Sequence, residues 1–240
     1  MRLVSFIIIG SLISGWALGG VIRDDFEDGN YKGWREIRGT LLGSEKASVR
    51  LENGVLVMKA IYDPPPLQPG LAFEAEIGLY TGKSTWTDYR FSCRIMHKGG
   101  KGAGGPLKIL IRSEEPDDQT NIFVNIKSDD VFMLRERPEG AEAKAFHREL
   151  GEAVFGESVR VSIGKWYRVE AIAEGSIIRW YLDDQLIGNF DTPEPRSGGV
   201  AFYAYCAHGW FDDVEIEGPD ISVPQKHSLA TSWAYVKAGQ

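Results

Sequence analysis

Short segments of alternating or β-branched residues, separated by turn-forming residues, constrain the fold of this 240-residue chain more than any other feature. Asn53 with Gly54 and Asp183 with Asp184 are typical of tight hairpin turns. Many short strands at such spacing predict an all-β, antiparallel sandwich or barrel. Residues 141–150 have a helical composition but also fit a strand with a charged outer face, so both structures remain open there. The predicted strands are 55–58, 89–96, 107–112, 122–127, 131–135, 167–173, 177–182, 200–206 and 214–216.

Composition supports one globular domain and argues against a nucleic-acid partner. Hydrophobic residues make up 43% of the chain and aromatic residues 11%, which is enough for a sizeable core. The formal net charge is −7, whereas proteins that bind phosphate backbones concentrate lysine and arginine.

The N-terminal residues are typical of a secretory signal. Arg2 is followed by an apolar stretch over residues 3–16, and Ala17 and Gly19 supply small residues at its end. The stretch is shorter than the roughly 20 residues of a spanning helix, although an uncleaved membrane anchor is the alternative. We therefore expect a signal peptide at 1–19, a folded domain at 20–218 and a linker with a tail at 219–240, in a secreted or periplasmic protein without further membrane contact.

Export would place Cys93 and Cys206 in an oxidising compartment, where they could pair. Alternation along 91–95 and 200–206 predicts that both thiols point inward. The alternative is two separate buried cysteines that behave as small apolar residues.

Alternation also predicts a polar and aromatic sheet face. If Phe91, Cys93 and Ile95 face the core, then Arg90 and Arg94 face away from it. Aromatic rings stack on the C–H faces of sugars, while arginine and asparagine bind hydroxyl groups. An ordinary solvated face is the alternative for any one of these residues. The candidate carbohydrate-binding residues are Trp86, Arg90, Arg94, Arg112, Asn125, Lys127, Tyr203 and Tyr205.

A series of short motifs follows the chain in a characteristic order. They are Asp25-Phe26-Glu27-Asp28-Gly29, Gly33-Trp34, Asn53-Gly54-Val55-Leu56, Trp86-Thr87-Asp88-Tyr89, Lys165-Trp166-Tyr167-Arg168-Val169, Trp180-Tyr181-Leu182-Asp183, Gly198-Gly199-Val200-Ala201-Phe202 and Trp210-Phe211-Asp212-Asp213-Val214-Glu215-Ile216. In this order they resemble the concanavalin A-like lectin/glucanase superfamily, specifically its laminin-G-like and 3-keto-disaccharide hydrolase (DUF1080) domains. The resemblance covers nearly all of residues 24–218.

This resemblance implies two curved antiparallel sheets packed as a jelly-roll sandwich, with the first and last strands adjacent. It implies carbohydrate as the partner, and the leading hypothesis is recognition of a poly- or oligosaccharide without chemistry. The basic candidate residues favour an acidic glycan. The alternatives are a glycoside hydrolase of the 3-keto-disaccharide type and a laminin-G-like adhesion or scaffolding module.

The candidate catalytic residues of the hydrolase alternative are Glu74, Glu76 and Asp88. Glu74 and Glu76 lie on one strand face roughly 7 Å apart, which a glycosidase pair can use. Family-16 glucanases, which share the fold, carry a longer Glu-x-Asp-x-x-Glu motif, but Gly78 and Leu79 stand where it should continue. A solvated acidic face is therefore the favoured interpretation.

Acidic residues gather where the ends of the domain are expected to meet. Asp25, Asp28 and Asp212 supply oxygen atoms that suit a structural Ca²⁺, and no other cofactor is required. The favoured alternative is that these carboxylates cap turns. In the tail, Leu229, Trp233 and Val236 have helical spacing, which suits docking on the sandwich or recognition by a partner. The default expectation for such a chain end is disorder.

Overall fold

The computed structural model describes residues 19–38, 46–61, 75–99, 105–113, 122–126, 132–136, 162–191 and 197–221. Residues 1–18, which fall in the expected signal peptide, the segment 141–150 and the tail from residue 222 lie outside the described residues. Within the part that is described, no helix is long and apolar enough to cross a membrane.

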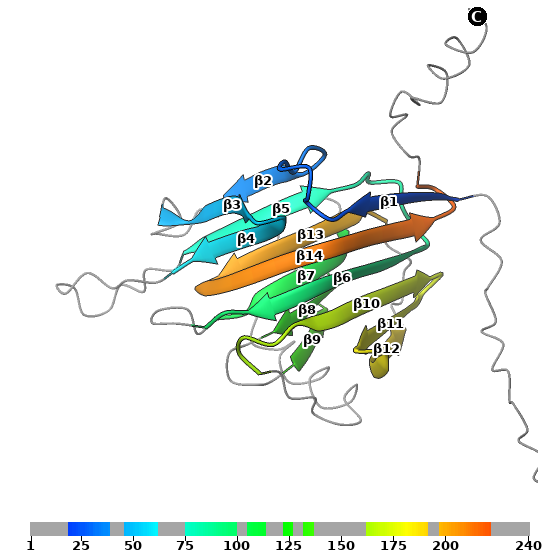
Figure 1. Ribbon diagram of the computed structural model, residues 1–240. Coiled ribbons are helices and arrows are strands. Elements are labelled where there is room, and N and C mark those ends of the chain that lie inside the picture. Colours follow the sequence, from blue (N-terminus) through cyan, green and yellow to red (C-terminus); the bar gives the residue numbers. More distant parts are fainter. Residues whose placement is uncertain are drawn as a thin grey trace, which may run out of the picture.

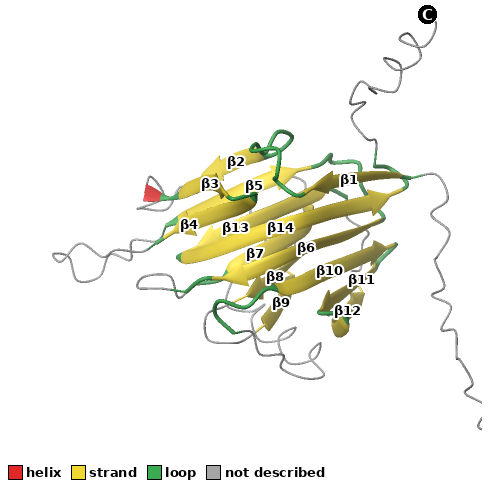
Figure 2. Cartoon of the chain, in the orientation of Figure 1, coloured by secondary structure: helices red, strands yellow, loops and turns green. Residues whose placement is uncertain are grey.

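Strands form nearly all of the regular structure and pack as two antiparallel sheets (Figures 1 and 2). The eight-stranded sheet has the order β12-β11-β10-β6-β14-β4-β3, and β1 pairs with β14. The six-stranded sheet has the order β2-β5-β13-β7-β8-β9. The strands are β1 (Gly20–Asp24), β2 (Arg35–Arg38), β3 (Ser48–Glu52), β4 (Val55–Ala60), β5 (Glu76–Thr81), β6 (Tyr89–His97), β7 (Leu107–Ser113), β8 (Ile122–Ile126), β9 (Phe132–Glu136), β10 (Tyr167–Glu174), β11 (Ile177–Leu182), β12 (Gln185–Asp191), β13 (Gly199–Tyr205) and β14 (Ala207–Gly218). The all-β sandwich expected from the sequence is confirmed.

The first and last strands are adjacent, as the resemblance implied. In the antiparallel pair of β1 and β14, Asp24 lies opposite Val214. Backbone hydrogen bonds therefore join the two ends of the sandwich domain, through the two strands that lie farthest apart in the sequence.

The two predicted hairpin turns are also confirmed. Asn53 and Gly54, with φ of 52° and 75°, connect β3 to β4. Asp183 and Asp184, with φ of 45° and 65°, connect β11 to β12. Two successive positive φ values match the right-handed twist of the paired strands, and asparagine, aspartate and glycine tolerate them best.

Five strands were not among those predicted from the sequence: β1, β2, β3, β5 and β12. β2 alternates three charged residues with one apolar residue and lies at a sheet edge, so its pattern resembles a polar loop. The predicted strand 214–216 extends over the whole of β14, interrupted by a register shift between Asp212 and Glu215. Asp213 has φ of 48° within this bulge. The bulge interrupts the alternation, so the sequence pattern predicted only the residues that follow it.

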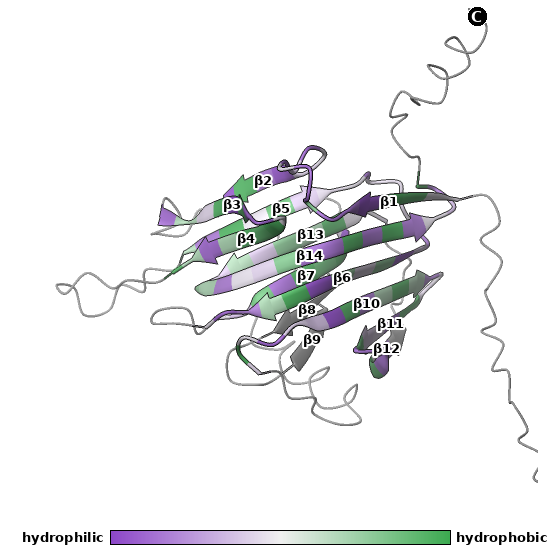
Figure 3. Ribbon diagram, viewed as in Figure 1, coloured by the Kyte–Doolittle hydropathy of each residue, from purple (hydrophilic) through white to green (hydrophobic). Residues whose placement is uncertain are grey.

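The hydrophobic core fills the space between the sheets. Hydrophobic and hydrophilic residues alternate along β14 in Figure 3, and its apolar set faces the core. Phe202 is central, because its ring stacks on Trp34 at 4.9 Å and on Phe211 at 4.6 Å between ring centroids. The core thus links β13 of one sheet to β14 of the other through stacked aromatic rings.

Cys93 and Cys206 do not form a disulfide. Cys93 points inward as expected and is buried, and burial raises the pKa of its thiol. Cys206 is half-buried and lies just beyond the end of β13 with φ of 46°, which breaks the alternation that predicted an inward thiol. The structure therefore supports the alternative of two separate cysteines.

We expect Asp24→Ala to lower the free energy of unfolding by about 1–3 kcal/mol in urea denaturation. The carboxylate of Asp24 accepts hydrogen bonds from the Trp34 indole Nε1 at 2.8 Å and from the Phe26 backbone N at 3.0 Å. Both donors would lose a partly buried acceptor. Asp25→Ala is the matched control, because Asp25 is exposed and accepts one longer hydrogen bond, and an equal loss there would contradict the argument.

Candidate functional site

Tyrosine and charged side chains gather on the outer face of the six-stranded sheet. Strand register places Tyr203 of β13 between Gly78 of β5 and Lys108 of β7, and Tyr205 opposite Glu76. Tyr80 lies two residues beyond Gly78 in β5, on the same face. We call Glu76, Tyr80, Lys108, Tyr203 and Tyr205 the tyrosine face.

A sheltered ion pair lies within the tyrosine face. Lys108 Nζ is 3.7 Å from Glu76 Oε1, and the two side chains keep only 10% and 11% of their surface exposed. Lys108 Nζ also lies 5.2 Å from the ring centroid of the half-buried Tyr205. Removing two opposite charges from water costs free energy that their attraction repays only in part. A sheltered ion pair is thus not explained by stability alone, which makes it a candidate site.

The ring of Tyr203 lies closely against β5. A Cβ added to Gly78 would be 2.7 Å from Tyr203 Cε1 and 2.8 Å from Cδ1, closer than such contacts occur. Glycine at position 78 therefore allows the ring to lie across the neighbouring strand. The same glycine that interrupts the glucanase-like carboxylate motif accommodates an aromatic ring on this face.

Arg90 and Arg94 lie on the other sheet, on its outer face. Arg90 pairs with Glu170 at 2.7 Å, and Arg94 pairs with Asp213 at 3.2 Å. The alternation that pointed them away from the core is confirmed by the burial of β6. Because the two outer faces point in opposite directions, these arginines cannot share one surface with Tyr203 and Tyr205.

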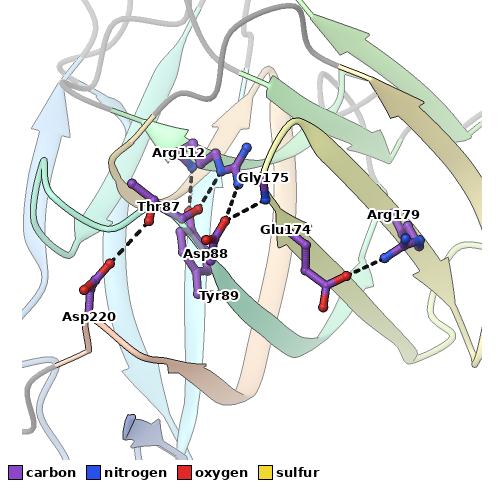
Figure 4. A network of polar contacts seen from close by, with 8 residues as sticks. All are labelled: Thr87, Asp88, Tyr89, Arg112, Glu174, Gly175, Arg179 and Asp220. Carbon is purple, nitrogen blue, oxygen red and sulfur yellow. Dashed lines mark hydrogen bonds and ion pairs between the residues drawn. The ribbon is translucent and has the colours of Figure 1, made fainter. Parts of the chain in front are cut away.

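Arg112 and Trp86 lie at the end of the sandwich, and neither contributes to the tyrosine face. A register shift in β7 leaves Arg112 with φ of 51°, so its side chain leaves the row that contains Lys108. Its guanidinium donates to the carbonyl of Thr87 at 2.7 Å and to Asp88 at 3.2 Å (Figure 4). Trp86 is 2% exposed and packs edge-on against Tyr89, so it offers no free ring plane. From the sequence, both residues were expected on a polar sheet face that binds carbohydrate, but the structure places them elsewhere.

Asp88 is too far from Glu76 to act with it on one glycosidic bond. Asp88 lies beside Arg112, near the end of β5 at which Thr81 pairs with Val200. Glu76 begins β5, about 17 Å away by the rise of a strand. Glycosidase carboxylates lie about 5–9.5 Å apart. Glu74, the other candidate partner, lies outside the described residues.

Two further candidates are placed only in part. Asn125 lies in β8 opposite Lys108, so the strand register puts it in the same row as Tyr203. Lys127 lies outside the described residues.

The acidic residues near the ends of the domain accept hydrogen bonds from their own turns. Asp25 accepts from the Glu27 backbone N, Asp28 from the Asn30 backbone N, and Asp212 from the Asp213 backbone N. Among the described residues, no group of three or more histidine, cysteine, aspartate or glutamate side chains could hold a metal ion. The contacts support the turn-capping alternative over a calcium site.

Sequence reasoning left Tyr80 and Lys108 out of the candidate set. Their signal was nevertheless present, because Glu76, Gly78 and Tyr80 alternate with the apolar Ile77 and Leu79. What was missing was the pairing of β5 with β13, which brings these residues beside Tyr203.

Comparison with solved structures defines the class of fold. A carbohydrate-binding module, CBM66 from Bacillus subtilis, has 18% sequence identity over 78% of this chain and 96% of that chain, with a TM-score of 0.53. The β-glucanase of Bacillus licheniformis has 13% identity over 82% of this chain and 98% of its own, with a TM-score of 0.54. The cellulose-induced protein Cip1 has 16% identity over 81% and 96% of the two chains, with a TM-score of 0.55.

The chain thus has the β-sandwich fold of carbohydrate-binding modules and glucanases. At these identities the likeness concerns the fold alone. No protein-family model matches the chain, and no curated protein matches its sequence.

Proposed function

We propose that this chain is an exported carbohydrate-binding domain whose tyrosine face binds a poly- or oligosaccharide. The observation that carries this proposal is the sheltered Glu76–Lys108 pair among Tyr80, Tyr203 and Tyr205. The half-buried Tyr205 is the ring that can stack on a sugar C–H face, since Tyr80 and Tyr203 are only 9% and 2% exposed. A carboxylate beside an ammonium group offers an acceptor and a donor for hydroxyl groups. Such hydrogen bonds are stronger in a sheltered site than in water.

The charge of the tyrosine face favours a neutral sugar. Glu76 and Lys108 balance each other, and the arginines that favoured an acidic glycan lie elsewhere. The proposed export agrees with the start of the fold, since β1 begins at Gly20 and cleavage after Gly19 would leave it whole.

The test is retention of the purified chain on neutral polysaccharides, combined with calorimetry on soluble oligosaccharides. We expect Glu76→Gln to weaken binding by about tenfold or more, because a hydrogen bond to a charged group contributes about 1.5–3 kcal/mol. Glu215→Gln is the matched control, since it removes a carboxylate paired with Arg23 on the opposite sheet. No retention of the unmodified chain, or an equal loss in both variants, would contradict the proposal.

The same samples separate binding from the two alternatives. Release of reducing sugar, including from 3-keto-glycosides, that disappears in Glu76→Gln would make Glu76 catalytic and the protein a hydrolase of that type. Absence of binding to every soluble sugar would instead favour a laminin-G-like adhesion module.

A further inference from the structure

Two tryptophan side chains lie on the outer face of the eight-stranded sheet, opposite the tyrosine face. Trp210 of β14 lies between Met96 of β6 and Val57 of β4 in the strand register. Its ring centroid is 6.3 Å from that of Trp166, which directly precedes β10. Both indoles are half-buried and therefore partly accessible.

A row of basic side chains runs beside Trp210. His208 of β14 lies directly opposite Lys59 of β4, and on its other side the backbone N of Lys98 donates to the His208 carbonyl at 2.8 Å. Lys98 Nζ lies 4.1 Å from the Trp210 ring centroid. Alternation in the three strands points these side chains outward, since their neighbours Ala60, His97 and Ala207 are buried. We call Lys59, Lys98 and His208 the basic row.

The lysines of the basic row differ from the arginines of this sheet face, because no carboxylate in the described ranges forms an ion pair with them. Arg90, Arg168 and Arg179 each pair with a glutamate. Within the described part of the chain, no carboxylate pairs with Lys59 or Lys98. Like charges on adjacent strands destabilise a sheet, so the row has an unbalanced positive field that an anion would relieve.

The pKa of His208 is affected by this positive charge. The Nε2 atom of His208 is buried and has no hydrogen-bond partner among the described residues. Burial, together with the positive charges of Lys59, Arg50 and Lys98, lowers the pKa of His208, and only Glu52, which is paired with Arg50, acts in the opposite direction. An anion bound at the row would bring a negative charge to all three side chains and favour protonation of the imidazole.

We propose that the basic row, with Trp210 and Trp166 beside it, binds an anionic group of a polysaccharide: the carboxylate of a uronic acid or a sulfate ester. Lysine ammonium groups suit either anion, protonation of His208 would add a positive charge beside them, and the indoles offer apolar area to the sugar ring that carries the anion. The net charge of −7 opposes long-range attraction of any polyanion, so this site would recognise its anion at short range, where the indoles beside it supply the contact with a sugar ring. This site goes beyond the proposed function, because it lies on the other sheet and takes a charged ligand.

The test uses calorimetry of the full chain with dextran sulfate, polygalacturonate and neutral dextran. We expect one or both anionic polymers to bind, and the better one to identify the preferred anion. The double variant Lys59→Gln/Lys98→Gln should weaken this binding by about tenfold or more, because two charge-assisted hydrogen bonds are lost. Lys32→Gln/Lys46→Gln is the matched control, since it removes the same charge from two exposed lysines, and it should change binding by less than about twofold.

A second measurement follows the protonation of His208. Because the pKa of His208 is lowered below its ordinary value of about 6.5, the imidazole is neutral at neutral pH and gains a positive charge only as the pH falls below that value, so binding should tighten there. His208→Gln should remove this dependence while leaving binding at the higher pH nearly unchanged.

Three results would overturn the proposal: an equal loss in the lysine control, equal binding of neutral dextran, or competition by anionic phospholipid vesicles as strong as that by the polymers. Each double variant is first checked for a melting temperature within about 4 °C of the unmodified chain. Glu76→Gln should leave binding of the anionic polymers intact, so failure at one face is distinguishable from failure at the other.

Discussion

Asp88→Ala is expected to lower the free energy of unfolding by about 3 kcal/mol or more, although Asp88 is a partly exposed residue. Its side chain is 42% exposed, whereas that of its partner Arg112 is 0% exposed. Burial lowers the pKa of Arg112, but a guanidinium still remains charged. Without Asp88, the partners that remain for the buried charge in the described part of the chain are neutral, such as the carbonyl of Thr87.

This effect extends beyond one pair, because Asp88 and Arg112 join three parts of the sandwich (Figure 4). Asp88 also accepts from the backbone N of Gly175 in the β10–β11 turn at 2.8 Å. The backbone N of Arg112 donates to the Tyr89 hydroxyl at 2.6 Å, and this hydroxyl donates to the carbonyl of Gly199. Burial raises the pKa of Tyr89, so the hydroxyl stays protonated.

Urea denaturation of a small variant set measures the effect. Asp220→Ala is the matched control, because this exposed carboxylate accepts from the neutral Thr87 hydroxyl nearby, and we expect a loss of about 0.5 kcal/mol or less. In the Asp88→Ala background, Arg112→Met should restore part of the stability by removing the uncompensated charge. If the second substitution only adds to the loss, the buried charge is not the cause.

Phe202→Ala is expected to lower the free energy of unfolding by about 3–5 kcal/mol. Phe202 is fully buried, and its ring stacks between Trp34 and Phe211. Truncation would remove both stacking contacts and leave a cavity between the sheets that the surrounding strands cannot close.

Leu186→Ala is the control for this substitution, since the Leu186 side chain is 50% exposed and its truncation should cost about 1 kcal/mol or less. Thermal and urea unfolding of both variants provide the comparison. A Phe202→Ala chain that unfolds at the same urea concentration as the control would mean that Phe202 does not connect the sheets as the structure indicates.

The sequence predicted the strands that alternate clearly, such as β6, β11 and β13, and the hairpin turns at Asn53 and Asp183. It missed β2, where three charged residues surround one apolar residue, and β12, where Gly188 and a register shift beside it interrupt the alternation. It also placed Arg112 on an outer face, because alternation continues only as long as the register holds, and the bulge in β7 breaks it.

The candidate site was predicted in part. Tyr203, Tyr205 and Glu76 lie together on the tyrosine face, whereas Arg90 and Arg94 lie on the opposite side of the sandwich. Alternation shows that a side chain points away from the core, but in a two-sheet fold there are two outer faces. A single strand contains no information about which of them it joins.

The sequence by itself determined the all-β fold class and the inward or outward direction of most strand residues, because strand periodicity is a local property of the chain. Only the tertiary structure decided which strands are neighbours, and therefore which polar residues meet. The Glu76–Lys108 pair joins strands that both flank β13, and the basic row joins β4, β14 and β6. Both clusters depend on strand pairing between distant segments, which the packing of the two sheets selects.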